Sequence, residues 1–252
     1  MNLISEALVL QRKDLVVVVG AGGKTTIINR LAGELLDAGK KVVVSTTTKI
    51  FAPSTRNSVP VLLTDKLDDL QSSILNIISQ TNYVIVGKNI NYENKITGLS
   101  MEEVEKIHKI NEVDFLLIEG DGAKNKPFKA PRSYEPVIPA IATLVVPVVG
   151  VECAGKPLIE DYFHAIDEIC ALTGLNYGDI VNEKVIAHIM LHPKGYKKNV
   201  PNHARWIPFI NKVETKTGEK SALKLARILK EAGVDKIIIG SAMSNPPVKQ
   251  IC

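Results

Sequence analysis

Gly20-Ala21-Gly22-Gly23-Lys24-Thr25-Thr26 directly follows the apolar run Leu15-Val16-Val17-Val18-Val19. A run of β-branched apolar residues predicts a strand that is buried on both faces of a parallel sheet. After the glycines, residues 24–38 show a helical period with Gly39 at its end, and the apolar stripe of this helix consists of Ile27, Ile28, Leu31, Leu35 and Leu36. The order of strand, glycine-rich loop and helix therefore predicts a βαβ unit whose loop binds phosphate.

The residue types of this loop suit a nucleoside triphosphate. Glycines let successive backbone N–H groups turn toward an anion, and the helix N-terminus adds partial positive charge. Lys24 is placed to neutralise the β and γ phosphates, with a catalytic role, and Thr25 to ligate Mg²⁺. Val18 stands where the pattern GxxxxGK[ST] has its first glycine, so the loop is two residues shorter. This GxxGKTT spacing resembles the loop of Mur-type ligases. The predicted nucleotide-binding residues here are Gly20, Ala21, Gly22, Gly23, Lys24, Thr25 and Thr26.

Strand and helix patterns alternate along the rest of the chain. Further strands are predicted at 41–46, 83–86, 115–118, 143–149, 206–210 and 236–239, and further helices at 66–80, 100–111, 161–172, 182–191 and 217–233. This order predicts an α/β fold with a doubly wound, mostly parallel sheet of the P-loop NTP-hydrolase type. We expect a single nucleotide-binding domain over 1–252, with long loops at 87–98, 122–140 and 192–205.

The composition favours a protein that acts on metabolites. The chain has 252 residues, 45% of them hydrophobic, which is enough for one large core. Its net charge is only +4 and no basic run is interleaved with aromatics, so we expect no nucleic-acid partner. Cys153, Cys170 and Cys252 form no CxxC pair, which argues against a disulfide framework or a zinc knuckle. The first 11 residues do not form a signal peptide and no apolar run reaches about 18 residues, so we expect a cytoplasmic protein without a membrane partner.

A second candidate element is Asp114-Phe115-Leu116-Leu117-Ile118-Glu119-Gly120-Asp121, an apolar strand that ends in acids as a Walker B strand does. Its carboxylates are expected beside the glycine loop, because the carboxyl ends of parallel strands meet at one edge of the sheet. One of Glu119 and Asp121 would hold the hydration shell of Mg²⁺, and the other would orient or activate a nucleophile. The sequence leaves open which does which, so both are candidate catalytic and metal-binding residues.

Further polar residues are predicted near the phosphates. Ser45-Thr46-Thr47-Thr48-Lys49 ends the second apolar strand, at the sheet edge where ligands usually bind. Thr48 is a candidate metal ligand and Lys49 a candidate phosphate contact. Beyond Asp121, Lys124 and Lys129 are candidates for contact with phosphate or with an anionic substrate.

A base-recognition pattern follows a late strand. Asn211-Lys212-Val213-Glu214 resembles the N-K-x-D motif of GTPases, in which the carboxylate accepts two N–H donors from guanine; here glutamate replaces aspartate. Gly240-Ser241-Ala242 follows the next strand and repeats the order of GTPase motifs. The alternative interpretation is a polar strand-to-helix turn. On the first interpretation the purine nucleotide is GTP ahead of ATP, and its candidate contacts are Asn211, Lys212, Glu214, Ser241 and Ala242.

The order of short motifs along the chain resembles one known family. The motifs are GAGGKTT, STTTKIFAP, LLIEGDGAKNKPFKAP, EPVIP, LVVPVVG, GKPL, LTGL, HPKG, VP, AR and NKVE. They are similar to those of YqeC, a family of accessory proteins of selenium-dependent hydroxylases. The chain departs at Ala21, where that family often has glycine, and at His164-Ala165-Ile166, in place of a His-Arg-Pro-like run, which weakens any role for His164. The resemblance implies a role in maturing selenium-dependent molybdenum hydroxylases, with such an enzyme or its maturation factors as partner.

Three functions remain open from the sequence. The first is a Mg²⁺-dependent NTPase whose hydrolysis drives a conformational or delivery step, carried by Lys24, Thr25, Glu119 and Asp121. The second is a small-molecule kinase or a Mur-like ATP-dependent ligase, favoured by the short loop and by Lys124 and Lys129 near the acids. The third is a non-enzymatic, nucleotide-gated chaperone that holds a partner or a selenium species through Cys153 or Cys170.

Overall fold

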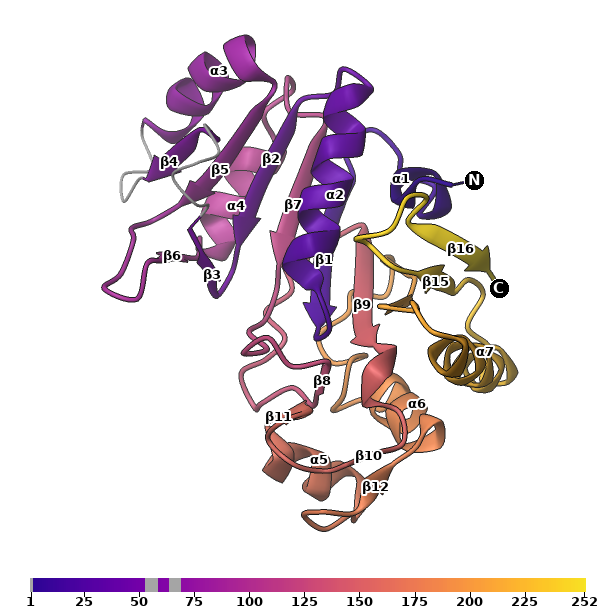
Figure 1. The fold of residues 1–252 in the computed structure, drawn as a ribbon. Coiled ribbons are helices and arrows are strands. Elements are labelled where there is room, and N and C mark those ends of the chain that lie inside the picture. Colours follow the sequence, from indigo (N-terminus) through magenta and orange to yellow (C-terminus); the bar gives the residue numbers. More distant parts are fainter. Residues whose placement is uncertain (1, 53–58, 64–68) are drawn as a thin grey trace.

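One large sheet runs through the computed structural model, which describes residues 2–52, 59–63 and 69–252 (Figure 1). Its order is β16-β15-β14-β9-β1-β7-β2-β5-β4, with β13 also paired to β9. The strands are β1 (Leu15–Gly20), β2 (Val42–Thr46), β4 (Val61–Leu63), β5 (Tyr83–Gly87), β7 (Phe115–Glu119), β9 (Leu144–Gly150), β13 (Arg205–Trp206), β14 (Phe209–Asn211), β15 (Ile238–Gly240) and β16 (Val248–Ile251). All neighbours are parallel except β15 and β16. The predicted doubly wound, mostly parallel α/β sheet is confirmed.

The valine run of β1 is apolar throughout because both of its faces are covered. Val16 and Val18 belong to one buried cluster with α1 (Ile4–Ala7) and α2 (Lys24–Asp37). Leu15, Val17 and Val19 belong to a second cluster with α3 (Leu70–Thr81) and α4 (Met101–His108) on the other face. Figure 1 shows α2 in front of the sheet and α4 behind it. Alternate side chains of a strand point to opposite faces, so each face receives an unbroken apolar stripe.

A third buried cluster covers the C-terminal half of the sheet. It includes Val149, Ile210 and Ile239 from the strands and the apolar faces of α5 (Ile166–Thr173), α6 (Glu183–Leu191) and α7 (Lys216–Glu231). Four of the short elements lie beyond the carboxyl ends of the sheet strands (Figure 1): β8 (Phe128–Lys129), β10 (Lys156–Pro157), β11 (Phe163–His164) and β12 (Ile180–Val181), with η1 (Val151–Cys153) following β9 directly. Another small antiparallel pair, β3 (Lys49–Phe51) with β6 (Lys95–Thr97), follows β2.

The structure differs from the sequence prediction in several places. The strand predicted at 206–210 is split into β13 and β14, because Pro208 has no N–H to give to the ladder. The helix predicted at 161–172 begins only at Ile166, because residues 163–164 pair with β8 as β11. The predicted loops at 87–98 and 122–140 contain β6 and β8, and the last residue of 192–205 begins β13. Residues 66–68 of the helix predicted at 66–80 lie outside the described residues, and α3 begins at Leu70.

Among the described helices, none combines the length and the apolar character that a crossing of the lipid bilayer requires.

Candidate functional site

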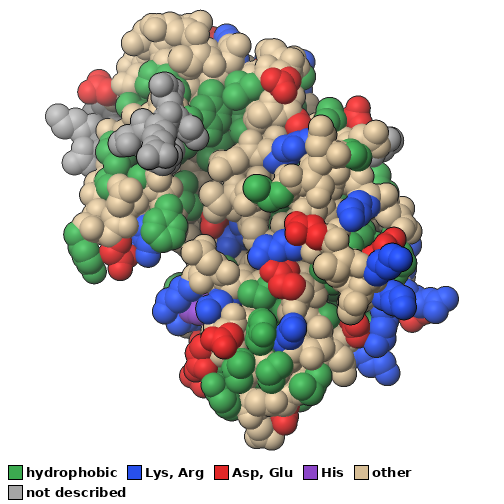
Figure 2. All heavy atoms as spheres, in the orientation of Figure 1, with side chains coloured by type: hydrophobic (Ala, Val, Ile, Leu, Met, Phe, Trp, Pro, Cys, Tyr) green, Lys and Arg blue, Asp and Glu red, His purple; other side chains and the backbone are tan. Residues whose placement is uncertain are grey.

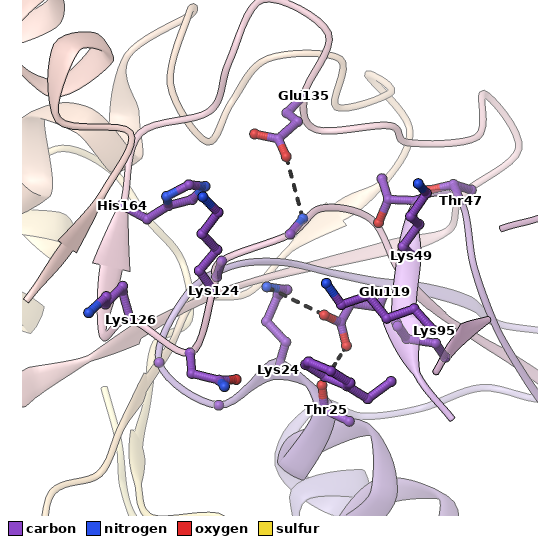
Figure 3. A pocket seen from close by; sticks show the side chains of 18 of the residues that line it. Lys24, Thr25, Thr47, Lys49, Lys95, Glu119, Lys124, Lys126, Glu135 and His164 are labelled. Atoms are coloured by element: carbon purple, nitrogen blue, oxygen red, sulfur yellow. Dashed lines mark hydrogen bonds and ion pairs between the residues drawn. The ribbon is translucent and has the colours of Figure 1, made fainter. Parts of the chain in front are cut away.

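A cavity of about 970 Å³ opens at the carboxyl edge of β1, β7 and β2 (Figure 3). Its floor is formed by the glycine loop, residues 20–26, of which Gly22, Gly23, Lys24, Thr25 and Thr26 line the cavity. Residues 47–51 and Lys95 line one side, and residues 122–126 line another. Ligands of α/β sheets bind at this edge, so the position of the cavity is the one that the sequence predicts.

The glycines of the loop are required by its shape. Gly20, Gly22 and Gly23 have φ of +91°, +87° and +113°. Residues other than glycine rarely adopt these backbone angles. A Cβ atom on Gly22 would lie 2.1 Å from the backbone nitrogen of Gly150. The loop is therefore wedged against the end of β9, and no other residue fits at Gly22.

The protein itself uses the first three N–H groups of the loop. Gly20 donates to Asp121, Ala21 to the carbonyl of Val148 and Gly22 to the carbonyl of Lys126. The four N–H groups that follow, those of residues 23–26, meet no acceptor among the described residues. They are the unpaired donors of the first turn of α2, which is the part of a helix that attracts anions. The N–H groups of Gly20, Ala21 and Gly22 therefore hold the shape of the loop, and those of residues 23–26 are left as donors for an anion.

Glu119 and Asp121 occupy different positions. Glu119 lines the cavity, where its Oε2 accepts a hydrogen bond from Thr25 Oγ1 at 2.7 Å and its Oε1 lies 3.6 Å from Lys24 Nζ. Asp121 is only 1% exposed, and both of its carboxylate oxygens lie 3.0 Å from the amide nitrogen of Gly20. Glu119 is thus the acid on the Thr25 side of the cavity, whereas Asp121 lies behind Lys24.

Burial and neighbouring charges set the protonation of Lys24 and Glu119. Burial alone would lower the pKa of Lys24, but the carboxylates of Asp121, at 3.3 Å, and of Glu119 overcome that effect and raise it. Lys24 therefore keeps its charge, with Nζ donating to the Gly20 carbonyl at 2.8 Å. Burial raises the pKa of Glu119 against the opposing effect of Lys24 and Thr25. A cation placed beside Glu119 would favour its ionised form.

The predicted metal ligand Thr48 and the predicted phosphate contacts Lys49, Lys124 and Lys129 fall into two groups. Thr48, Lys49 and Lys124 line the cavity. Lys129 does not line it: its side chain is fully buried and pairs with Glu135 at 2.5 Å and with Asp121 at 3.4 Å. The carbonyl of Gly122 accepts a third contact from Lys129 at 2.6 Å. Lys129 thus fixes the loop after β7 from inside.

The N-K-x-E residues meet the 241–242 turn beside the glycine loop. Asn211 is 2% exposed; its Nδ2 donates to the Gly22 carbonyl at 2.8 Å and its Oδ1 accepts from the Ala242 N–H at 2.9 Å. Ser241 Oγ donates to Glu214 Oε1 at 2.8 Å, and the Glu214 side chain is exposed. Of these motif residues only Lys212, which pairs with Glu152, lines the cavity. Apart from Lys212, the motif residues therefore contact the glycine loop and the 241–242 turn without lining the cavity.

Several cavity residues were not predicted as site residues. They are Lys95, Lys126, Arg132, Tyr134, Glu135 and His164. Most of them lie in the stretches 87–98 and 122–140, where the length of the loop and, for Lys126 and Glu135, a place in the family motifs were the signals available. His164 was set aside because the chain departs from the family run at 164–166 and because residues 161–172 were predicted to be helical.

The strand, glycine loop and helix, with a lysine and a threonine opposite an acid at the end of the neighbouring strand, define a protein of the P-loop-like α/β class. The chain belongs to the YqeC protein family, because that family's model matches residues 16–167, more than half of the chain. The uncharacterized protein YqeC of Escherichia coli (strain K12) is 28% identical over 238 residues, which cover 94% of this chain and 91% of that protein. Among solved structures, the MinC:MinD cell division protein complex of Aquifex aeolicus matches with a TM-score of 0.44 and 15% identity, covering 90% of this chain and 81% of that one.

Asn211→Ala tests whether this side chain holds the glycine loop. The substitution leaves the Gly22 carbonyl and the Ala242 N–H buried without partners, at about 1–3 kcal/mol for each group. We expect the free energy of unfolding, measured by urea denaturation, to fall by at least about 2 kcal/mol. Asn176→Ala, at an exposed position, is the matched control and should change it by less than about 0.5 kcal/mol. Equal effects of the two substitutions would contradict the role of Asn211 in holding the glycine loop.

Proposed function

We propose that this chain binds a purine nucleoside triphosphate with Mg²⁺ and hydrolyses it, with GTP preferred over ATP. The observation that carries the proposal is the convergence of four unpaired N–H groups, Lys24, Thr25 and Glu119 on one edge of the sheet. Charge-assisted donors and a helix N-terminus suit a triphosphate tail better than a neutral ligand.

The donor set also fits Mg²⁺. A hydroxyl and a carboxylate are hard oxygen ligands, and Thr25 Oγ1 and Glu119 Oε2 lie 2.7 Å apart at the cavity wall. Proteins usually bind Mg²⁺ through one or two such groups together with substrate phosphates and water. When bound, the ion neutralises charge on the phosphate oxygens. Thr25 and Glu119 would hold it directly or through water, with Thr48 as a further hydroxyl on the same wall.

Lys24 and Asp121 have distinct parts in this proposal. Lys24 would leave the Gly20 carbonyl and contact the phosphates, since its ammonium already lies at the glycine loop and lines the cavity. Asp121 acts as a positioning residue, because it holds both the Gly20 N–H and the Lys24 ammonium. Lys49 supplies a further cation to the phosphates from the β2 side.

The preference for guanine is supported by the hydrogen bonds of Asn211 to Gly22 and Ala242 and by the exposed side chain of Glu214. A guanine ring has two N–H donors that one carboxylate can accept together, whereas adenine does not. Ser241 fixes one oxygen of Glu214, and Asn211 fixes the 242 turn next to the glycine loop. A nucleotide whose base lies at Glu214 could therefore have its phosphates at residues 23–26.

Hydrolysis should depend on Lys24 and Glu119. We expect Lys24→Ala and Glu119→Gln each to lower kcat for GTP by about 10²–10³-fold, because each removes a charged group that acts on the phosphates or the metal. Phosphate release is the measurement, with and without Mg²⁺. Lys40→Ala, at an exposed position after α2, is the control and should leave the rate unchanged. Thr25→Ala serves as a milder change should a charge variant fail to fold. A rate that is unchanged in all three site variants would exclude the proposal.

Base preference is tested by competition of GTP and ATP against a fluorescent nucleotide. For Glu214→Ala we expect the Kd of GTP to rise about tenfold or more, because two hydrogen bonds to a charged acceptor are lost, while the Kd of ATP stays the same. Glu219→Ala, an exposed glutamate in the first turn of α7, is the control. An equal change for the two nucleotides would show that Glu214 does not recognise the base.

We also propose that hydrolysis serves the maturation of a selenium-dependent molybdenum hydroxylase in the cytoplasm. The support is the likeness in motif order between this chain and the YqeC family, whose accessory role is the one that the sequence resemblance implies. With Lys24→Ala in place of the unaltered chain, such a hydroxylase should be produced with less selenium, as measured by elemental analysis. An unaltered selenium content would count against the role.

A further inference from the structure

The cavity extends beyond the part that nucleotide phosphates would occupy. The base-recognition residues Glu214, Ser241 and Ala242 do not line it, so a nucleotide bound at the glycine loop would send only its phosphates inward. The volume of about 970 Å³ is at the upper end of the range of about 300–1,000 Å³ for small-molecule sites. Lys124, Arg132, Tyr134 and His164 line the cavity and belong neither to the glycine loop nor to the base-recognition motif.

His164 is held at this wall by a short strand pair. β11 pairs with β8 so that Phe163 lies opposite Phe128 and His164 opposite Lys129. The two phenylalanine rings are buried and meet edge to face, with centroids 6.4 Å apart. Because neighbouring side chains of a strand point to opposite faces, burying Phe163 directs His164 to the cavity. Figure 3 shows its imidazole beside the end of the Lys124 side chain.

Basic residues outnumber acids in the lining of the cavity. Seven Lys and Arg residues line it against Glu119 and Glu135, although Lys24, Lys95 and Lys212 each pair with a carboxylate. Among the described residues, no carboxylate lies within 4.0 Å of the Lys124 ammonium, and the contact of Arg132 with Glu168 is long, at 3.9 Å. Figure 2 shows Lys and Arg side chains, with a histidine among them, gathered at the indentation between the upper and lower parts of the molecule. Cations that converge in a concave site raise the local concentration of anions.

The imidazole of His164 responds to these cations. Burial, together with the charges of Lys129, Arg132 and Lys124, lowers its pKa to about 4. The ring is therefore neutral at pH 7, with one donor and one acceptor nitrogen. An anion that came to lie between the ring and the cations would raise this pKa.

We propose that Lys124, Arg132 and His164 form a second oxyanion subsite, which takes the phosphate or carboxylate group of a small co-substrate beside the glycine loop. Arg132 offers a planar fork that suits either group, Lys124 a point charge and His164 a neutral hydrogen bond. The inference rests on the proposed function only for the nucleotide at the loop. It places a second anionic ligand in the same cavity as the terminal phosphate.

The test follows the His164 ring by NMR, with its signals assigned by comparison with His164→Gln. A non-hydrolysable GTP analogue first saturates the glycine loop, and inorganic phosphate or malonate is then added in separate titrations. We expect a saturable shift of the His164 signals and a higher His164 pKa with at least one probe; the effective probe distinguishes a phosphate from a carboxylate ligand. Lys124→Ala and Arg132→Ala should each weaken binding about tenfold, through loss of a charge-assisted hydrogen bond. Arg227→Ala, an exposed arginine on α7, should bind as the unaltered protein does.

The outcomes separate this inference from the proposed function. If the analogue does not bind but the His164 shift persists and is weakened by Arg132→Ala, the subsite stands and the nucleotide proposal fails. If the shift appears only without the analogue and disappears in Lys24→Ala, the anion binds at the glycine loop and the subsite is refuted. A missing or non-saturable response with both probes refutes the subsite as well. So does binding by the Lys124→Ala and Arg132→Ala variants that is as tight as binding by the unaltered protein.

Discussion

The carboxylate of Asp121 is the contact on which the site depends. It accepts the N–H of Gly20 with both oxygens within 3.0 Å and lies between two buried ammonium groups, those of Lys24 and Lys129. Buried charges are costly unless each is paired and hydrogen-bonded. Here the glycine loop is tied to β7 on one side, and Lys129 carries the tie onward to Glu135. The loop, Lys24 and the segment after β7 therefore hold their positions as one unit.

Asn211 is a second residue that holds the glycine loop in place, through hydrogen bonds to Gly22 and Ala242. It joins the Gly22 carbonyl to the Ala242 N–H, so that the turn carrying Ser241 is held against the same loop that Asp121 holds from the other direction. One side of the loop then faces the exposed Glu214, and the other faces the cationic cavity. A single ligand lying across the loop would have its base and its phosphates in chemically different surroundings. In the function proposed above, this division would separate base recognition from the residues proposed to bind a second anion.

Much of the fold follows from local sequence. Continuous valine runs predict the central strands because both faces of a parallel sheet are buried, and the glycines before Lys24 predict the loop because only they adopt its backbone angles. The sequence also brings Thr25 and Glu119 to one edge. It does not separate the roles of Glu119 and Asp121, since both follow the same strand and only packing decides which one faces the cavity. The surroundings of Lys129 and His164 could not be read from the sequence, because the two-residue pair of β8 and β11 is too short to leave a periodic pattern. Lys129 is buried by its contacts with Asp121, Glu135 and the Gly122 carbonyl, whereas His164 lines the cavity.

The short form of the loop has a physical consequence for how the site holds phosphate. The N–H groups of Gly20, Ala21 and Gly22 are used by Asp121 and by two backbone carbonyls, so within the glycine loop only residues 23–26 have N–H groups without an acceptor among the described residues. Fewer backbone donors leave more of the anion's charge to be met by side chains. The cavity supplies those as lysines and arginine on three separate segments, residues 47–51, 122–126 and 132, around the glycine loop. Because these cations come from segments outside the loop, an anion bound at the loop would also contact the wall that carries His164.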